Sequence, residues 1–249
     1  MSNIARDPWS DFRTLTAARI ALGRCGGSLP TRELLDFGLA HARARDAVTT
    51  PLDVDSLLAE LQAGGLQTML LSSAAGSREE YLRRPDLGRR LSDESLRQMQ
   101  SMPQGSPFDL CLIISDGLSA RAVSHAAGIA IGLHSLLRDE GWRIAPVFIV
   151  PMARVALQDQ LGEAVGAALS LILLGERPGL GSPDSLGAYF VHEPRVGKTD
   201  ADRNCVSNIR PEGLPLEAAV GTLHYLLNAA RFHRLSGIHL KDERLLPGT

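Results

Sequence analysis

Three segments rich in polar or small residues follow apolar runs in the chain, and their residue types could bind a ligand. They are 115–119 (SDGLS), 151–155 (PMARV) and 175–181 (GERPGLG). In the last segment an acid and an arginine lie directly past an apolar run, where a carboxylate can accept hydrogen bonds from amide or hydroxyl groups of a ligand. The alternative is an ion pair between Glu176 and Arg177 at the edge of a sheet.

The first segment offers a close approach of backbone to a ligand. Gly117 permits such an approach, and Ser119 can cap a helix that follows, which leaves N–H groups free for an oxygen-rich ligand. An ordinary Asp-Gly turn is the alternative. Neither G-x-G-x-x-G nor G-x-x-x-x-G-K-[ST] occurs in these segments, which counts against ordinary dinucleotide and nucleoside triphosphate sites.

Cysteine and histidine give weaker candidates. Cys205, in the segment 202–208 (DRNCVSN), could act as a nucleophile beside a base, but a buried thiol that packs as a small hydrophobe is the alternative. The three cysteines form no C-x-x-C pair, which argues against a disulfide framework and a zinc cage. The seven histidines show no H-E-x-x-H spacing. We therefore predict no catalytic residue and no metal ligand in this chain.

The elements that must position these residues form an α/β fold. Continuous apolar runs are typical of parallel strands buried on both faces, and the stretches between them are long enough for crossover helices. Because the carboxyl ends of parallel strands share one edge, the three polar segments should lie together there. The expected strands are 110–114, 144–150, 169–174 and 188–192, and the expected helices are 119–140, 158–168 and 216–232.

The first part of the chain predicts short helices. We expect a mainly helical N-terminal region over 1–105 and a Rossmann-like domain, with a mainly parallel sheet and helices on both faces, over 106–249. The first helix should begin at Pro8, after an Asp7 cap, and end at Gly23, and the second, from Thr31, should carry an apolar stripe. Further expectations are helices after Asp53 and Ser92, a strand at 66–71, and a boundary at 103–107.

The stripe of the second expected helix consists of Leu34, Leu35, Leu39 and Ala42. The arginine-rich segment 83–90 predicts a solvated turn, with a contact to an acidic surface of another subunit as the alternative.

Composition restricts the class of protein. The 26 basic and 28 acidic residues nearly cancel, so no field favours nucleic acid or an anionic membrane. The N-terminus has no apolar signal-peptide core, and no apolar run approaches the roughly 20 residues that span a bilayer. We expect a soluble protein of the reducing cytoplasm.

Five strings together resemble the small, or light, subunit of adenosylcobalamin-dependent ethanolamine ammonia-lyase. The resemblance runs from about Asp7 to about Ile238. The strings are ARIALGRCGG at 18–27, YLRRPDLGRRL at 81–91, ISDGLS at 114–119, GERPGLG at 175–181 and DRNCVSNIR at 202–210.

The resemblance implies a function and a partner. This chain would form one wall of a cobalamin site against a large, barrel-shaped subunit, which supplies the substrate pocket for the radical conversion of ethanolamine to acetaldehyde and ammonia. The cobalamin contacts fall on Val155, Glu176 and Cys205. The lower-ligand pattern D-x-H-x-x-G is broken because Val123 stands two residues before His125, so cobalamin should keep its own base on cobalt.

Two other functions remain as hypotheses. One is a stand-alone Rossmann-type module that binds a nucleotide or phosphorylated metabolite, and the other is an independent cysteine enzyme that depends on Cys205. Only six residues precede Asp7. Some members of the resembled family carry a longer leader that is associated with packing into a bacterial microcompartment, so such packing is left open.

Overall fold

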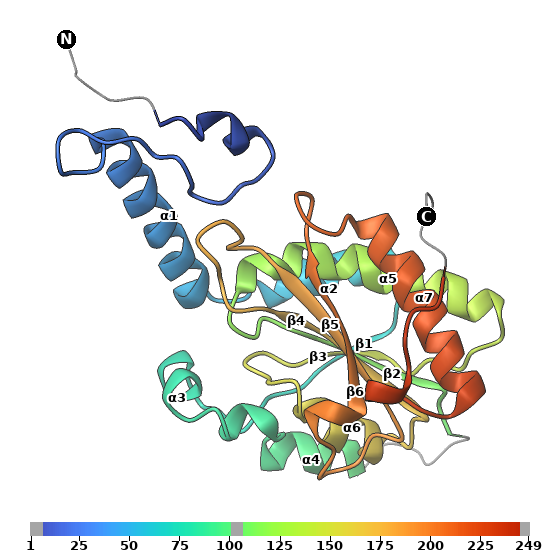
Figure 1. The fold of residues 1–249 in the computed structure, drawn as a ribbon. Coiled ribbons are helices and arrows are strands. Elements are labelled where there is room, and N and C mark those ends of the chain that lie inside the picture. The colour runs from blue at the N-terminus through green and yellow to red at the C-terminus, as the bar shows by residue number, and fades with distance from the viewer. Residues whose placement is uncertain (1–6, 101–106, 245–249) are drawn as a thin grey trace.

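The computed structural model describes residues 7–100 and 107–244 and shows a mixed α/β fold around one six-stranded sheet (Figure 1). The strand order is β1-β3-β2-β4-β5-β6. Neighbours are parallel from β1 to β4, whereas β5 is antiparallel to both β4 and β6. The strands are β1 (Thr68–Leu70), β2 (Leu110–Ser115), β3 (Val147–Ile149), β4 (Leu169–Gly175), β5 (Leu186–His192) and β6 (Arg203–Ile209).

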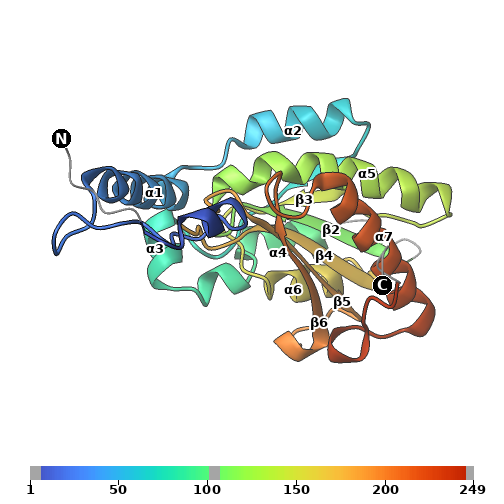
Figure 2. The same ribbon diagram turned by 45° about the horizontal axis from the view of Figure 1, so that its top comes forward.

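Helices cover both faces of this sheet, as Figures 1 and 2 show. The longer helices are α1 (Thr31–Thr49), α2 (Val54–Ala63), α3 (Arg78–Arg83), α4 (Asp93–Gln100), α5 (Ala126–Asp139), α6 (Leu157–Ala164) and α7 (Leu216–His233). Short 3-10 helices are η1 (Ser10–Thr14), η2 (Leu87–Arg89), η3 (Ala120–His125), η4 (Asp200–Asp202) and η5 (Gly237–His239).

The side chains of β2 explain why the strands read as continuous apolar runs. Leu112 and Ile114 face a core built with α2, α5 and α7, whereas Cys111 and Ile113 face a second core built with α4 and α6. All six residues of β2 are buried. Because both faces are covered, each position must be apolar or internally paired. The predicted fold class is confirmed.

The expected strand 144–150 is shortened, and one observed strand was not expected. The run 144–150 yields only β3, because Pro146 lacks the N–H that a ladder needs. Ile144 makes only an isolated bridge to Leu110. β6 contains Cys205 but was not expected as a strand, since it lies at the sheet edge and its buried residues stand singly among exposed or half-buried ones, without an apolar run.

The predicted first helix, from Pro8 to Gly23, is wrong. Only η1 forms there, and the Asp7 side chain accepts a hydrogen bond from the backbone N–H of Trp9 (2.9 Å). Phe12 and Leu15 are exposed. An isolated helix of this length is marginal in water, and the segment has no core against which an apolar face could pack.

The later helices begin close to the predicted residues. Asp53 caps α2 by accepting from the N–H of Ser56 (3.0 Å), and Ser92 accepts from the N–H of Ser95 (3.2 Å) at the start of α4. Thr31 begins α1 without a capping hydrogen bond from its side chain. The four arginines of 83–90 are exposed, in agreement with a solvated turn.

The division at 103–107 lies largely outside the described residues and stays a prediction, although the edge strand β1 comes from the part before it. Within 7–100 and 107–244, no helix combines the length and the apolar character needed to cross a membrane.

Candidate functional site

Two glycines hold the carboxyl ends of β2 and β4 together. Gly117 has a φ of +49°, and a Cβ there would lie 2.3 Å from the carbonyl oxygen of Gly175. The N–H of Leu118 donates to that same oxygen (2.9 Å). The close approach at Gly117 is therefore made to the loop after β4 of this chain, and an approach to a ligand stays a prediction.

The predicted capping role of Ser119 is wrong. Its side chain caps no helix and instead donates to the carbonyl of Pro183 (2.7 Å), in the connection between β4 and β5. The backbone carbonyl of Ser119 accepts from the N–H of Ala122 (3.2 Å), so the chain enters η3 directly. This hydroxyl therefore holds two loops together.

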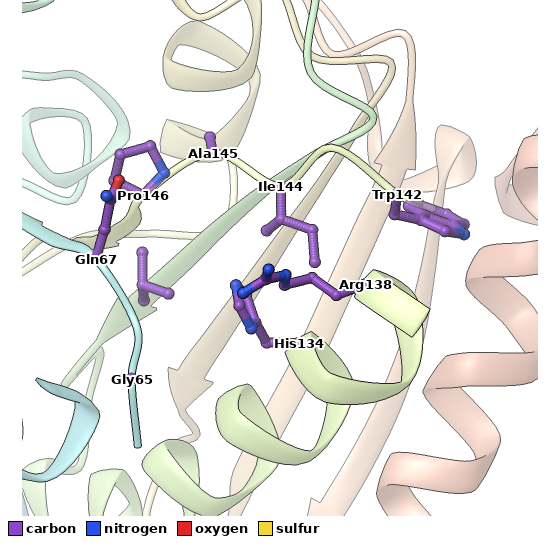
Figure 3. A pocket seen from close by; sticks show the side chains of 9 residues that line it. Gly65, Gln67, His134, Arg138, Trp142, Ile144, Ala145 and Pro146 are labelled. Carbon is purple, nitrogen blue, oxygen red and sulfur yellow. The ribbon is translucent and has the colours of Figure 1, made fainter. Parts of the chain in front are cut away.

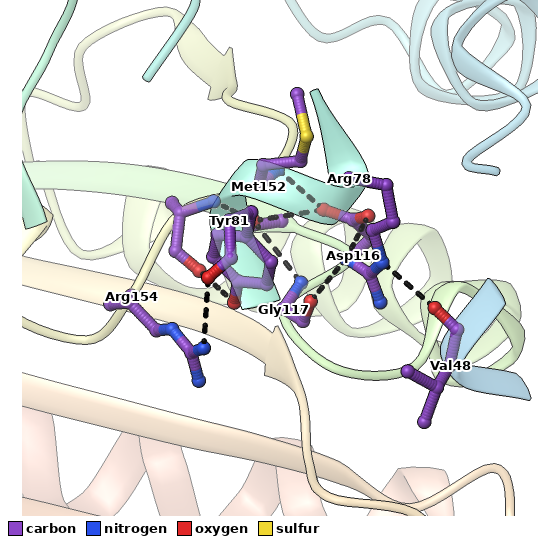
Figure 4. Close-up of polar contacts among 9 residues, drawn as sticks. Val48, Arg78, Tyr81, Asp116, Gly117, Met152 and Arg154 are labelled. Atoms are coloured by element: carbon purple, nitrogen blue, oxygen red, sulfur yellow. Dashed lines mark hydrogen bonds and ion pairs between the residues drawn. The ribbon is translucent and has the colours of Figure 1, made fainter. Parts of the chain in front are cut away.

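Ser115 and Asp116 join the loop after β2 to the loop after β3. The Asp116 carboxylate accepts from the backbone N–H of Met152 (2.6 Å), and the Ser115 hydroxyl accepts from that of Ala153 (3.0 Å) (Figure 4). Arg78 donates to the other oxygen of Asp116 (3.0 Å). Burial raises the pKa of Asp116, while these donors oppose that shift. This carboxylate supports the loops from within.

Tyr81 lies between two guanidinium groups beside these loops. The guanidinium carbon of Arg154 is 4.2 Å from the ring centroid and that of Arg78 is 5.1 Å away. The hydroxyl of Tyr81 donates to the carbonyl of Ala153 (3.0 Å), and burial raises the pKa of Tyr81 to about 12. The Nε of Arg154 is buried and has no hydrogen-bond partner among the described residues.

A cavity of about 380 Å³ opens at this edge of the sheet. Its position is where a ligand of an open parallel sheet is expected, outside the carboxyl ends of the strands. The lining residues are Tyr81, Leu118, Arg154, Leu174, Gly175, Glu176, Arg177 and Tyr189.

Glu176 in this cavity is held by its own protein. Its carboxylate accepts from the hydroxyl of Ser185 (2.5 Å), the hydroxyl of Tyr189 (3.3 Å) and the backbone N–H of Asn208 (3.3 Å). A carboxylate offers about four acceptor positions, so about one remains for a ligand. Glu176 bonds to these three groups rather than pairing with Arg177, which is exposed.

Tyr189 links Cys205 to Glu176, because it pairs with Cys205 across two strands and its hydroxyl bonds to Glu176. Tyr189 and Cys205 are paired residues on β5 and β6. Partial desolvation raises the pKa of the Cys205 thiol, a hydrogen bond with Tyr189 lowers it, and the negative charge of Glu176 raises it again. Cys205 is exposed, so the alternative of a buried thiol that packs as a small hydrophobe is wrong, and its raised pKa makes the thiol a poor nucleophile, which disfavours the independent cysteine enzyme.

Val155 occupies the margin of the site. It is half-buried and packs against the core on the α6 face, to which Tyr189 also belongs, and it does not line the cavity. Its neighbour Arg154 does. The structure therefore brings Glu176 and Cys205 together and places Val155 on an adjacent loop.

Sequence reasoning missed Tyr81, Arg154 and Tyr189 as parts of the site. Tyr81 begins one of the five family-like strings, and Arg154 directly precedes Val155, so the motifs could have identified both residues. The pairing of Tyr189 with Cys205 depends on strand register, which no local pattern reveals.

A second cavity, of about 240 Å³, lies at the opposite edge of the sheet, before β3 (Figure 3). His134 and Arg138, one turn apart on α5, extend side by side there. Burial and the charge of Arg138 lower the pKa of His134. The predicted ligand-binding loops lie at the other edge, so this cavity is separate from the candidate site.

Comparison with known proteins agrees with the resemblance seen in the motifs. A family model described as "Ethanolamine ammonia-lyase light chain (EutC)" matches residues 6–241. A relative from Ralstonia nicotianae is 50% identical over 99% of this chain and 92% of its own length. Relatives from Xanthomonas campestris pv. campestris (52% identical; 98% and 92% covered) and Azotobacter vinelandii (51%; 97% and 91%) are similar.

All three relatives bear the name "Ethanolamine ammonia-lyase small subunit". The family model covers nearly the whole chain, including the loops after β2, β3 and β4 and the strand β6 that form the candidate site. The stand-alone nucleotide module loses support accordingly. The chain belongs to the ethanolamine ammonia-lyase light chain family.

Proposed function

We propose that this chain is the cobalamin-holding small subunit of an adenosylcobalamin-dependent ethanolamine ammonia-lyase that is active only with its large subunit. The observation that carries the proposal is the convergence of Glu176, Tyr189 and Cys205 beside a cavity at the carboxyl edge of the sheet. Two of the three contacts implied by the resemblance, Glu176 and Cys205, thereby become neighbours.

The residues of the cavity fit the polar periphery of a corrinoid, which carries amide groups and a phosphodiester. Arg154 offers a buried Nε without a partner among the described residues, and Glu176 keeps about one free acceptor position. Arg177 adds a second, exposed cation. The site thus presents both a donor and an acceptor to such groups.

The size of the cavity supports a shared site. Pockets for drug-sized ligands measure about 300–1,000 Å³, and a corrinoid is larger than such a ligand. A cavity of about 380 Å³ can therefore hold only part of it. The remainder would lie against the large subunit, so this chain acts as one wall.

The roles of this chain are binding and positioning. Glu176 accepts hydrogen bonds from amide groups, Val155 gives apolar contact, and Cys205 packs or bonds weakly at the margin. Adenosylcobalamin, when bound, supplies a radical that abstracts hydrogen from ethanolamine, and the protein positions the cofactor for that chemistry.

The position of His125 supports the proposal that the cofactor keeps its own base on cobalt. Its Nε2 is 3.6 Å from a carboxylate oxygen of Asp184, and the ring does not line the cavity. A lower-ligand histidine needs an orienting group on its other nitrogen and an open path to cobalt. We therefore propose base-on binding. We also propose a cytoplasmic complex, and labelling in cells will test whether a microcompartment encloses it.

Cobalamin uptake by the assembled pair of subunits tests the proposal. The combined variant Val155→Ala, Glu176→Ala and Cys205→Ala should form the complex but bind cobalamin about 10-fold more weakly or worse, in line with the loss of several contacts. A matched control is Val196→Ala with Glu193→Ala, at the opposite edge of the sheet. Unchanged uptake by the triple variant, or turnover by the lone chain, would overturn the proposal.

A further inference from the structure

The segment from Asp7 to Thr49, here called the N-terminal arm, has almost no core of its own. Of residues 7–39, only Pro30 is buried. Figure 1 shows η1 and the first turns of α1 projecting away from the sheet and its covering helices. The arm joins the body through the last turns of α1, where Ala47 is fully buried.

Apolar side chains are nevertheless concentrated on this arm. On α1, Leu34, Leu35 and Leu39 are 58%, 67% and 51% exposed. On the preceding segment, Trp9, Phe12 and Leu15 are also exposed. These six residues are called the docking surface below. Soluble proteins seldom leave so many large apolar side chains together in water unless another surface covers them.

Apart from a contact between the rings of Trp9 and Phe12 (centroids 5.4 Å apart), the arm does not use these side chains to stabilise its shape. It is held by polar contacts, since Arg13 and Glu33 form an ion pair (3.2 Å) and the guanidinium of Arg19 lies 5.9 Å from the ring centroid of Phe37. Glu33 and Phe37 are one turn apart on α1 and contact the preceding segment. Leu34 and Leu35 are left facing solvent.

Part of the docking surface is hollowed. A groove of about 420 Å³ runs between η1 and the segment that follows it. Trp9, Phe12, Leu15 and Ile20 line this groove together with Asp7 and Thr16. An aromatic or aliphatic side chain of a partner fits a groove of this kind, as anchors do in stable interfaces.

Two residues of the arm, Arg19 in its first part and Val48 at its end, bond to segments that line the candidate site. Arg19 donates to the carbonyl of Leu180 (3.3 Å), in the connection that also carries Glu176. Near the other end, Arg78 at the start of α3 donates to the carbonyl of Val48 (2.8 Å), and α3 carries Tyr81. A protein that closes over the cavity therefore meets the arm.

We propose that the docking surface binds the large subunit of the enzyme, so that the arm grips the partner beside the shared cavity. This inference rests on the proposed function. The relatives' name, "small subunit", implies a larger one, and the continuity of the arm with the open cavity selects it over a second copy of this chain. Exposed aromatic side chains such as Trp9 and Phe12 suit the core of an interface, where aromatic residues are enriched.

Assembly with the large subunit, measured without cobalamin, tests the proposal. The variant Leu35→Asp with Leu39→Asp should weaken binding to the large subunit by about 30-fold or more, because charge replaces two central apolar contacts. The control Val196→Asp with Ile238→Asp changes residues that are 71% and 67% exposed, away from the arm, and should bind normally. Unchanged binding of the Leu35/Leu39 variant overturns the proposal.

Folding and self-association are separated by two further measurements. The four altered side chains are exposed, so circular dichroism and the thermal midpoint of both variants should match the parent. A photo-crosslinker placed at Leu34 should join this chain to the large subunit. Light scattering of the lone chain reports a second copy: an oligomer that Leu35→Asp with Leu39→Asp dissociates, with large-subunit binding intact, overturns the proposal.

This outcome differs from failure of the cobalamin proposal. A variant of the docking surface should fail to assemble even when no cobalamin is present. The triple variant of Val155, Glu176 and Cys205 should assemble and then bind cobalamin weakly. Normal assembly of the first variant, with weak uptake by the second, would sink the docking proposal alone.

Discussion

Gly175→Ala should destabilise the protein strongly, because the contact between the loops after β2 and β4 leaves no space for a methyl group. A Cβ at Gly175 would lie 2.2 Å from the carbonyl oxygens of Asp116 and of Ser119. Both oxygens belong to the backbone and cannot rotate away as a side chain could. Overpacking of this kind costs about 1–3 kcal/mol of stability and sometimes more. Because two backbone atoms clash here, we expect a loss of about 3 kcal/mol.

The measurement is thermal unfolding of the chain followed by circular dichroism. For a chain of this size, 1 kcal/mol shifts the midpoint by about 2–4 °C, so Gly175→Ala should lower it by about 6–12 °C. Gly221→Ala is the matched control, since Gly221 lies inside α7 with nothing within 4 Å of its added Cβ. Alanine is a better helix former than glycine by about 1 kcal/mol, so the thermal midpoint of this variant should be slightly higher than that of the parent. A Gly175→Ala midpoint within 2 °C of the parent would refute the clash argument.

Two further changes test the surroundings of the site. In a Cys25→Ser background, Glu176→Gln removes the charge that raises the pKa of Cys205, so a disulfide reagent at pH 8 should modify that thiol faster; an unchanged rate contradicts the electrostatic coupling. Tyr81→Phe leaves the buried carbonyl of Ala153 without its donor and should lower the free energy of unfolding by about 1–2 kcal/mol in urea titration, whereas no change would mean that water replaces the hydroxyl.

The parallel core could be predicted from the sequence because a strand buried on both faces requires a continuous apolar run. Leu110–Ser115 and Leu169–Gly175 were expected within one residue of their observed ends. The edge strand β6 was missed, since its buried residues stand singly among exposed or half-buried ones and form no apolar run. The first helix was wrongly expected, because periodicity cannot show that a segment has nothing to pack against.

The candidate site was predictable in its position and less so in its chemistry. The parallel direction of the predicted strands placed the three polar loops at one edge of the sheet. The family motifs added Cys205 to the predicted site residues. The carboxylate of Glu176, however, mostly bonds to Ser185, Tyr189 and Asn208. Such pairing joins residues from separate strands, and only the register of β4, β5 and β6 brings them together.

The antiparallel direction of β5 separates the sequence constraints on the connection 176–185 from those on the parallel core. Because β5 returns antiparallel to β4, the connection 176–185 starts and ends at the same edge, and no crossover helix depends on its length. Mutations that lengthen or rewrite the middle of this connection leave the parallel core in register, provided that Glu176 and Ser185 keep their bond. Evolution can thus adjust the ligand-facing rim independently of the interior that folds it.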